Sequence, residues 1–185
     1  MVAIDASNVA LVLLAAGRSE RFGARKMEAD LNGLPLGLHA AQLFAGFGFA
    51  QHLVVVGTSE LNFDANGFVT IVNPAPEQGQ SSSLRLGICA VTAKACMIAL
   101  ADMPFVTVDH VNAMLAQFDG DRLASSCDTR IMPPALFGER HYAPLAALTG
   151  DQGARILLRD APHVVGDRKC LADIDHPDDL AEWIR

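Results

Sequence analysis

The sequence predicts an α/β fold in which a largely parallel sheet is covered by helices on both faces. Short apolar runs with strand character alternate with longer segments of helical period. The strand-like runs are apolar throughout, which indicates burial on both faces and is typical of parallel strands. With 185 residues, 51% of them hydrophobic, the chain has the size and composition of one ordered domain spanning residues 1–185.

In the first half of the chain the predicted elements alternate regularly. Strand-like runs lie at 9–14, 53–56, 69–72 and 97–100, and helical segments lie at 36–47 and 84–91. Right-handed crossovers bring the carboxyl ends of parallel strands to one edge of the sheet, where ligands of open α/β sheets bind. We therefore expect function in the three unusual loops that follow strands, at 15–26, 73–83 and 101–107.

The second half of the chain is predicted to begin with a helix over 107–118 and strand material over 122–132, with a turn near Ser126. The pair Pro133-Pro134 is expected to reset the chain direction after this strand. The remaining elements are expected to be helical segments at 135–148 and 153–159, a short strand near 164–165, and a terminal helix from Pro177 through Ile184.

The loop after the first strand combines two glycines, Gly17 and Gly23, with four cations, of which Arg18, Arg21 and Lys26 are the candidates for phosphate contact. Glycine lets backbone N–H groups approach phosphate oxygens closely, and Arg and Lys side chains neutralise their charge. The loop therefore predicts polyphosphate binding. Its spacing matches neither the P-loop pattern GxxxxGK[ST] nor the GxGxxG fingerprint, and a solvated basic turn is the alternative interpretation.

The second loop places three consecutive hydroxyls, Ser81 to Ser83, at the start of a predicted helix. Any one of them could serve as a helix N-cap. Three in succession exceed what capping requires, and free N–H groups with hydroxyls at a helix N-terminus form an anion site. A second phosphate-bearing substrate is therefore expected to dock there.

The third loop places Asp102 directly after a buried strand. An unpaired carboxylate at such a position is costly, and Mg²⁺ is a suitable partner because it takes one or two protein carboxylates and shares substrate phosphates. The second carboxylate is expected from Asp173 and Asp175, which lie on one side of an extended segment. Capping of the last helix is the alternative role for Asp175.

The composition disfavours several classes of function. Acidic residues outnumber basic ones 21 to 14, whereas nucleic-acid binders cluster Lys and Arg. The apolar run at 9–16 is far shorter than the roughly 20 residues of a membrane span, and no basic segment precedes it as in a signal peptide. The four cysteines and six histidines show no metal-ligand spacing, and no GxSxG elbow is present. A cytoplasmic protein without nucleic-acid or membrane partners is expected.

Several motifs together resemble the nucleotidyltransferases that mature the molybdenum cofactor, most closely the MocA-type cytidylyltransferase branch of the MobA-like group. The motifs are LAAGRSERFGARK at 14–26, NPAPEQGQSSSLRLG at 73–87, LADMP at 100–104, PPALFGERHYAPLAALTGDQGAR at 133–155 and DIDHPDDL at 173–180. The resemblance implies a Rossmann-like nucleotidyltransferase fold, a three-layer α/β/α arrangement with a mostly parallel mixed sheet. It also implies transfer of CMP from CTP to the molybdopterin form of the cofactor with release of pyrophosphate, and transient contact with a molybdenum hydroxylase.

The resemblance also implies roles for individual residues. The implied nucleotide site consists of Leu14, Ala15, Ala16, Gly17, Arg18, Ser19, Arg21, Lys26 and Gly79. The implied acceptor site consists of Gln78, Ser81, Ser82, Ser83, Asp151 and Arg155. Arg21, Lys26 and Asp102 are implied to be catalytic, with Mg²⁺ held by Asp102 and Asp175. Members that use GTP tend to have LAGG where this chain has LAAG, so Ala16 favours cytosine.

Two departures from the group and several rival functions stay open. Arg130-Ile131-Met132 stands where relatives usually carry a glycine, and Met27-Glu28-Ala29-Asp30 adds acids beside the phosphate loop, so either change could alter the substrate. Some members of the same sequence group are pyridine-dye oxidoreductases that use a nicotinamide cofactor. A non-catalytic carrier of the molybdenum cofactor and a sugar-nucleotide or polyol-phosphate transferase are further alternatives.

Overall fold

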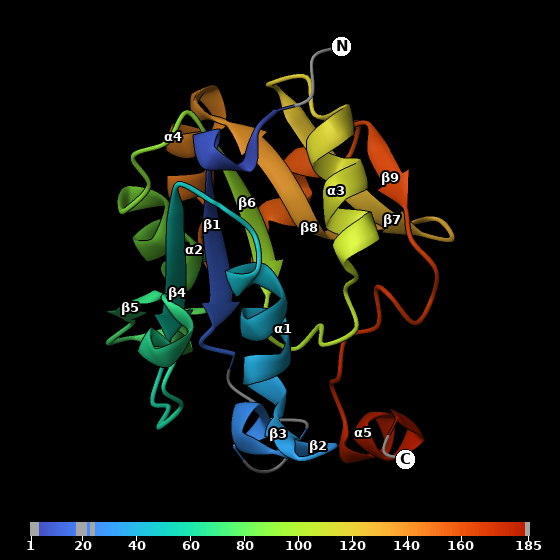
Figure 1. Cartoon of the computed structure of the whole chain (residues 1–185). Helices are drawn as coiled ribbons and strands as arrows, with labels where there is room; N and C mark the ends of the chain where they lie inside the picture. Colours follow the sequence, from blue (N-terminus) through green and yellow to red (C-terminus); the bar gives the residue numbers. More distant parts are fainter. Residues whose placement is uncertain (1–3, 18–21, 23–24, 184–185) are drawn as a thin grey trace.

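The computed structural model describes residues 4–17, 22 and 25–183. Its centre is a seven-stranded sheet in the order β5-β4-β1-β6-β8-β7-β9, shown in Figure 1. The strands are β1 (Val9–Ala15), β4 (Gln51–Val56), β5 (Val69–Val72), β6 (Ala95–Leu100), β7 (Arg122–Cys127), β8 (Arg130–Gly138) and β9 (His163–Val165). Neighbouring strands from β5 to β6 pair in parallel, and β8 runs antiparallel to both β6 and β7. The predicted mostly parallel mixed sheet is confirmed.

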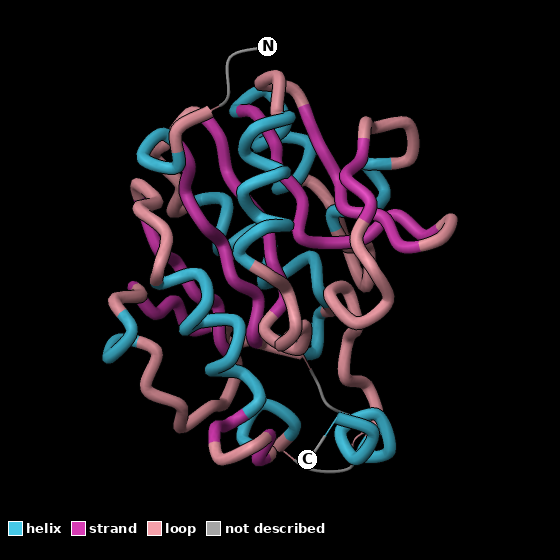
Figure 2. Tube along the Cα trace, turned by 45° about the vertical axis from the view of Figure 1, so that its right-hand side comes forward, coloured by secondary structure: helices cyan, strands magenta, loops and turns pink. Residues whose placement is uncertain are grey.

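Helices cover both faces of this sheet and complete three layers, as Figure 2 shows. On one face lie α1 (Leu36–Ala45) and α3 (Val108–Gln117), and on the other lie α2 (Gln80–Cys89) and α4 (Tyr142–Ala146). Short 3-10 turns occupy Ala6–Asn8, Lys26–Glu28, Asp64–Asn66, Pro76–Gln78, Glu139–His141 and Ala154–Leu158. None of the helices in these described ranges has the length and apolar character needed to cross a bilayer.

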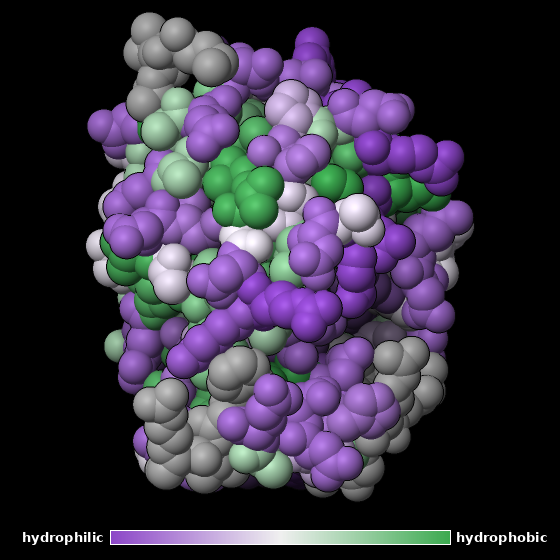
Figure 3. Space-filling view, turned by 90° about the vertical axis from the view of Figure 1, so that its right-hand side faces the viewer, coloured by the Kyte–Doolittle hydropathy of each residue, from purple (hydrophilic) through white to green (hydrophobic). Residues whose placement is uncertain are grey.

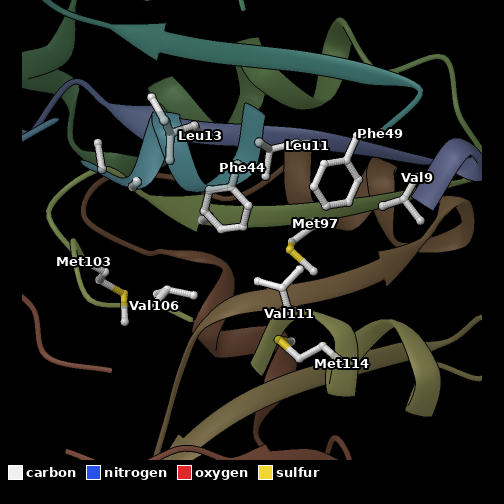
Figure 4. Close-up of a cluster of buried hydrophobic side chains, with 14 of the residues drawn as sticks. Val9, Leu11, Leu13, Phe44, Phe49, Met97, Met103, Val106, Val111 and Met114 are labelled. Carbon is white, nitrogen blue, oxygen red and sulfur yellow. The ribbon is translucent and has the colours of Figure 1, made fainter. Parts of the chain in front are cut away.

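Strand β1 explains why the central strands are apolar throughout. Each of its residues is at most 8% exposed. Its odd-numbered residues pack against α1 and α3, and its even-numbered residues pack against α2 and α4, because side chains alternate between the faces of a sheet. Figure 4 shows Val9, Leu11 and Leu13 on the first of these faces with Phe44 and Val111. At the sheet edge the expectation of two-sided burial is wrong, since Val69 of β5 is 62% exposed.

A third, smaller hydrophobic cluster lies below the carboxyl ends of the strands (Figure 1). It joins the hairpin of β2 (Asp30–Leu31) and β3 (Leu34–Pro35) to α5 (Pro177–Trp183). The hairpin turns at Asn32-Gly33, both with positive φ, a pair that favours two-residue turns. The sequence analysis missed this hairpin. On the side of β9 and α5 the surface is mostly hydrophilic, with small scattered hydrophobic groups (Figure 3).

The second half of the chain corrects two predictions. The turn that follows β7 lies at 128–129 rather than near Ser126. Pro133-Pro134 does not reset the chain but lies inside β8, and residues 135–138 continue that strand instead of starting a helix. The register passes from Ala124 opposite Ala135 to Ser125 opposite Met132, so the two prolines occupy a bulge, where no N–H is needed for the ladder.

Candidate active site

The carboxyl ends of β1 and β6 meet in the middle of the sheet, with Leu14 paired to Leu100 and the N–H of Ala101 donating to the Leu14 carbonyl. The loops that follow these two strands therefore begin side by side. They border a cavity of about 320 Å³, a size typical of small-ligand sites. Its lining is formed by Leu14, Ala16, Gly17, Lys26, Met27, Pro76, Gly79, Gln80, Ser83, Leu100, Asp102, Asp151 and Asp175.

Lys26 is the centre of the charged group in this cavity. Its Nζ donates to Asp102 Oδ2 at 2.8 Å and to Asp175 Oδ1 at 3.1 Å, although its side chain is only 7% exposed. The 3-10 turn Lys26–Glu28 buries both Lys26 and Met27, which directs the ammonium inward rather than to solvent. The structure thus brings together the lysine and the two carboxylates that the sequence predicted from three separate segments.

The pKa values of this group reflect burial opposed by pairing. Burial lowers the pKa of Lys26, but the nearby Asp102 and Asp175 carboxylates outweigh it and hold that pKa above its ordinary value. The lysine is therefore an ammonium at neutral pH. Burial raises the pKa of the Asp102 carboxyl, and the Lys26 ammonium opposes this rise.

Backbone contacts position Asp175 beside Asp102. The N–H of Ile174 donates to the Asp102 carbonyl at 2.9 Å, and the Ile174 side chain is fully buried in the third cluster. At the start of α5, the Asp179 carboxylate accepts hydrogen bonds from the N–H groups of Asp175 and His176. The first turn of α5 is thus tied by Asp179, while Asp175 Oδ1 faces Lys26.

The three serines of the second loop are buried and hydrogen-bonded within the protein. Asn73 Nδ2 donates to the hydroxyls of Ser82 and Ser83, at 2.8 and 2.9 Å. The Ser82 hydroxyl donates to the Gly79 carbonyl, and the Ser81 hydroxyl donates to the Gly150 carbonyl. None of the three is the N-cap of α2, which is Gly79. Ser83 alone of the three lines the cavity.

Gly79 forms the place where two loops meet. Its φ is +92°, and a Cβ added there would lie 2.5 Å from the backbone of Gly150. Only glycine allows this approach, which brings the 149–153 turn and Asp151 against the cavity. Gln78 and Arg155, also predicted for the acceptor, are exposed and do not line it. Gln80, Met27 and Pro76 line it without having been predicted, and no motif distinguishes them.

A second cavity adjoins the first and shares Ala16, Gly17 and Lys26 with it. The predicted Ala15 lines this second cavity, whereas Arg18, Ser19 and Arg21 lie outside the described residues. Its other wall is the loop after β4, at 57–59, which the sequence analysis did not consider. Because β4 pairs in parallel with β1, the rule that strand ends share one edge could have found this loop.

The two departures from the related group also have structural places. Glu28 pairs with Arg25 at 3.3 Å and accepts the N–H of Glu60, which ties it to the loop after β4. Arg25 also pairs with Glu60, at 3.0 Å. Residues 130–132 begin β8 and line neither of the two cavities at this edge.

The donor set suits Mg²⁺. Asp102 Oδ1 is buried without a hydrogen-bond partner, although Oδ2 of the same carboxylate binds Lys26. Two carboxylates at a cavity fit a cation that retains waters and shares substrate phosphates. Among the described residues, no group of three or more His, Cys, Asp or Glu side chains forms a closed metal site.

The cavity lies at the carboxyl ends of parallel strands, where open α/β sheets bind their ligands. Residues 11–165 match the model of the MobA-like NTP transferase domain. The chain belongs to this family of nucleotidyltransferases.

Named relatives and a solved structure are similar over most of the chain. The purine catabolism protein PucB of Bacillus subtilis is 29% identical, covering 91% of this chain and 92% of that protein. Nicotine blue oxidoreductase of Paenarthrobacter nicotinovorans is 27% identical over 83% of each chain. A probable molybdenum cofactor guanylyltransferase of Natranaerobius thermophilus is 28% identical, and the match covers 76% of this chain and 66% of that protein. The crystal structure of a Mycobacterium tuberculosis Rv0371c homologue from Mycobacterium sp. strain JC1 superposes with a TM-score of 0.81 at 26% identity. The superposition covers 95% of this chain and 96% of that chain.

Proposed function

We propose that the protein is a cytoplasmic, Mg²⁺-dependent nucleotidyltransferase that transfers CMP from CTP to the molybdopterin form of the molybdenum cofactor and releases pyrophosphate. The observation that carries this proposal is the Lys26 ammonium held by Asp102 and Asp175 at the edge of the cavity. Family membership and a relative named as a molybdenum cofactor guanylyltransferase support the reaction class and the acceptor. The product would pass to a molybdenum hydroxylase.

The charge of the cavity supports a metal-dependent reaction. Its described lining contains three carboxylates, Asp102, Asp151 and Asp175, and one cation, Lys26. A triphosphate would be repelled by this balance unless a further cation accompanied it. When bound, Mg²⁺ supplies neutralisation of the charge on the nucleotide phosphates and on the departing pyrophosphate. Asp102 and Asp175 are the residues that would hold it.

The proposed chemistry needs positioning more than proton transfer. A phosphate oxygen of the pterin attacks the α-phosphorus of CTP, a new P–O bond forms, and the bond to the β-phosphate oxygen breaks as pyrophosphate leaves. A phosphate monoester is already largely ionised at neutral pH, so no general base is required. Lys26 contributes a fixed positive charge to the phosphates, and the cavity holds the two reactants together.

The acceptor would bind on the side of the cavity formed by Ser83 and Asp151. Both line the cavity, and both belong to loops that meet at Gly79. The hydroxyl of Ser83 keeps acceptor capacity beyond the bond from Asn73. Ser81 and Ser82 then support this wall through internal hydrogen bonds, and Gln78 and Arg155 are left out of the proposed contact.

Pyrophosphate release tests the proposal directly. The protein would be incubated with CTP, GTP or ATP in the presence and absence of purified molybdenum cofactor. We expect pyrophosphate with CTP only when the cofactor is present, and less with GTP or ATP. Pyrophosphate from none of the three, or release that ignores the cofactor, would overturn the transfer reaction. Preference for GTP would overturn the choice of base alone.

Ala16 offers a sharper test of base choice, because it lines both cavities. The change Ala16→Gly creates the LAGG pattern of the related GTP users. We expect the ratio of turnover with CTP to turnover with GTP to fall in this variant. A Cβ added at the neighbouring Gly17 would have no atom within 4 Å, so Gly17→Ala is a comparison that also changes one methyl group but keeps residue 16 unchanged. An unaltered ratio in Ala16→Gly would remove Ala16 from base selection.

A second candidate function is favoured by the relative named nicotine blue oxidoreductase. In that case the protein would oxidise a nicotinamide cofactor and reduce a dye-like acceptor. The distinguishing measurement is the absorbance of NADH or NADPH with a pyridine dye. Cofactor consumption without pyrophosphate from CTP would favour the oxidoreductase, and the reverse result would favour the transferase.

A further inference from the structure

Lys26 occupies the position between two carboxylates that a divalent cation would also use. Its ammonium lies 2.8 Å from Asp102 Oδ2 and 3.1 Å from Asp175 Oδ1. Mg²⁺ and Mn²⁺ seek the same hard oxygen ligands. A cation bound to both Asp102 Oδ2 and Asp175 Oδ1 would displace the ammonium, because two positive charges cannot pair fully with one pair of carboxylate oxygens. A cation bound to Asp102 only through the unpartnered Oδ1 would leave Lys26 in place.

Hydrogen bonds fix the backbone beside the two carboxylate partners of Lys26. Asp175 follows Ile174, whose side chain is fully buried and whose N–H binds the Asp102 carbonyl. Asp102 follows Ala101, whose N–H binds the Leu14 carbonyl. The lysine ammonium, in contrast, ends a flexible four-carbon chain. If the group rearranges, the lysine is therefore the member that moves.

Open space lies beside the Lys26 side chain. It lines both adjoining cavities at the carboxyl edge of the sheet. A rotation of its side chain can carry the ammonium from the carboxylates toward a ligand in either cavity without a change in the backbone. Phosphate oxygens are suitable new partners because they are anionic acceptors of charge-assisted hydrogen bonds.

We propose that Lys26 is an exchangeable counterion, which neutralises Asp102 and Asp175 in the nucleotide-free protein and moves to the phosphates when a divalent cation takes over the carboxylates. The identity of the phosphate ligand rests on the proposed function. The exchange makes the lysine a competitor of the free cation. The divalent cation alone then binds weakly, because it must displace Lys26 from the carboxylates. Cation and nucleotide each raise the affinity for the other, because the cation pairs with the carboxylates and the phosphates pair with Lys26.

The first test measures binding of Mn²⁺ alone, by electron paramagnetic resonance, to the wild type and to Lys26→Met and Lys26→Gln. Removal of an internal competitor raises the apparent affinity by the inverse of the fraction of molecules in which the site is free, which is about tenfold for a free fraction of roughly one tenth. We expect both variants to bind Mn²⁺ about that much more tightly. The control is Lys94→Met, which removes an equal charge from an exposed lysine that lines a groove elsewhere and should match the wild type. Unchanged or weaker Mn²⁺ binding in the folded Lys26 variants would overturn the exchange.

The second test uses the wild type, so it stands even if both Lys26 variants fail to fold. Acetic anhydride labelling followed by mass spectrometry reports the accessibility of each lysine. Saturating Mn²⁺ should increase acetylation of Lys26 several-fold and leave that of Lys94 unchanged. Labelling of Lys26 that stays constant or decreases would contradict the exchange. Neither test contains CTP or an acceptor, so the exchange and the proposed reaction can fail separately.

Discussion

Two groups of paired charges lie at opposite ends of the central strands, and they differ in how far their side chains are buried. At the carboxyl edge, Lys26 is 7% exposed and pairs with Asp102 and Asp175. At the other end of the strands, Asp121 pairs with Arg140 and His141, whose side chains are 65% and 16% exposed, and Asp121 is 33% exposed. Asp121 is therefore similar in exposure to Asp175, at 41%, and the groups differ chiefly in the burial of Lys26 and Asp102. The first group joins residues 76 and 149 positions apart in sequence, and the second joins residues 19 and 20 positions apart.

The difference in burial indicates which charges contribute most to stability and to function. Water and salt screen an exposed ion pair, so its net contribution to stability is small. A buried group has lost that screening, and removal of one member leaves the others uncompensated. Both groups border a cavity, but of these described side chains only Asp102 has a buried oxygen without a hydrogen-bond partner, Oδ1. Changes to the buried group should therefore affect both stability and chemistry.

The largest expected effect is that of Asp102→Asn on transfer. This change keeps the shape of the side chain but removes the charge proposed to hold the metal. We expect the rate of pyrophosphate release to fall at least about a thousandfold, while calorimetry still detects weak nucleotide binding. The control Asp160→Asn removes the same charge from an exposed acid. Turnover at the wild-type rate in Asp102→Asn would eliminate the metal role and with it the contrast between the two groups.

The next effect concerns stability, measured by urea unfolding of Lys26→Met. Two acids lose their shared cation, and Asp175 is 41% exposed, so solvent recovers part of the loss. We expect the free energy of unfolding to fall by about 2 kcal/mol, with little change in the Lys94→Met control. Mg²⁺ should restore part of the stability of Lys26→Met. A variant as stable as the wild type would show that burial gives the first group no greater weight.

A third effect concerns the wall beside the buried group. Gly79→Ala introduces a Cβ at positive φ and in contact with the Gly150 backbone, whereas Gly67→Ala introduces one at positive φ with nothing within 4 Å. We expect a loss of about 1 kcal/mol for Gly67→Ala and a larger one, about 3 kcal/mol, for Gly79→Ala. Thermal unfolding of the pair measures the difference. Equal losses would mean that the 149–153 turn yields readily and does not fix the cavity.

The smallest effect is that of Asp121→Asn in the exposed group. Hydrogen bonds from His141 and then from Arg140 hold the pKa of Asp121 below its ordinary 3.8. A carboxyl whose pKa is lowered in the folded state stabilises the protein at pH values above its pKa in the unfolded chain. This contribution is lost as the pH falls through the folded-state pKa. We expect the variant to be less stable by about 0.5 kcal/mol at pH 7. Urea unfolding should show this difference shrink as the solution is acidified below pH 3.8. If Asp121→Asn lowered the free energy of unfolding as much as Lys26→Met does, the two ion groups would not differ in their contribution to stability.

The parallel half of the fold could be predicted because its signals are local. Strands β1, β4, β5 and β6 are apolar runs, and α3 begins at Val108 directly after its N-cap Thr107, whose hydroxyl accepts the His110 N–H. The antiparallel half was predicted less well, since whether Pro133-Pro134 ends a strand or occupies a bulge depends on pairing with β6 and β7. That pairing is a long-range contact that local patterns do not report.

The candidate site divides in the same way. Lys26 and Asp102 could be named because their loops follow buried strands. Asp175 could be named because it lies with Asp173 on one side of an extended segment, and because its motif resembles that of a family. The ion group itself could not be predicted, since it depends on how the third hydrophobic cluster brings residues 173–175 beside Asp102. The internal bonds from Asn73 to Ser82 and Ser83 were equally hidden. They show that a run of polar residues at a strand end can support a wall rather than face a ligand.

The most direct test is a crystal structure with Mn²⁺ and a CTP analogue that cannot release pyrophosphate. The anomalous signal of Mn²⁺ should appear beside Asp102 and Asp175, with the phosphates in the cavity and the Lys26 ammonium turned toward them. A nucleotide bound with its phosphates away from Lys26, or a metal ion in contact with neither carboxylate, would contradict the assignment of this edge of the sheet as the active centre.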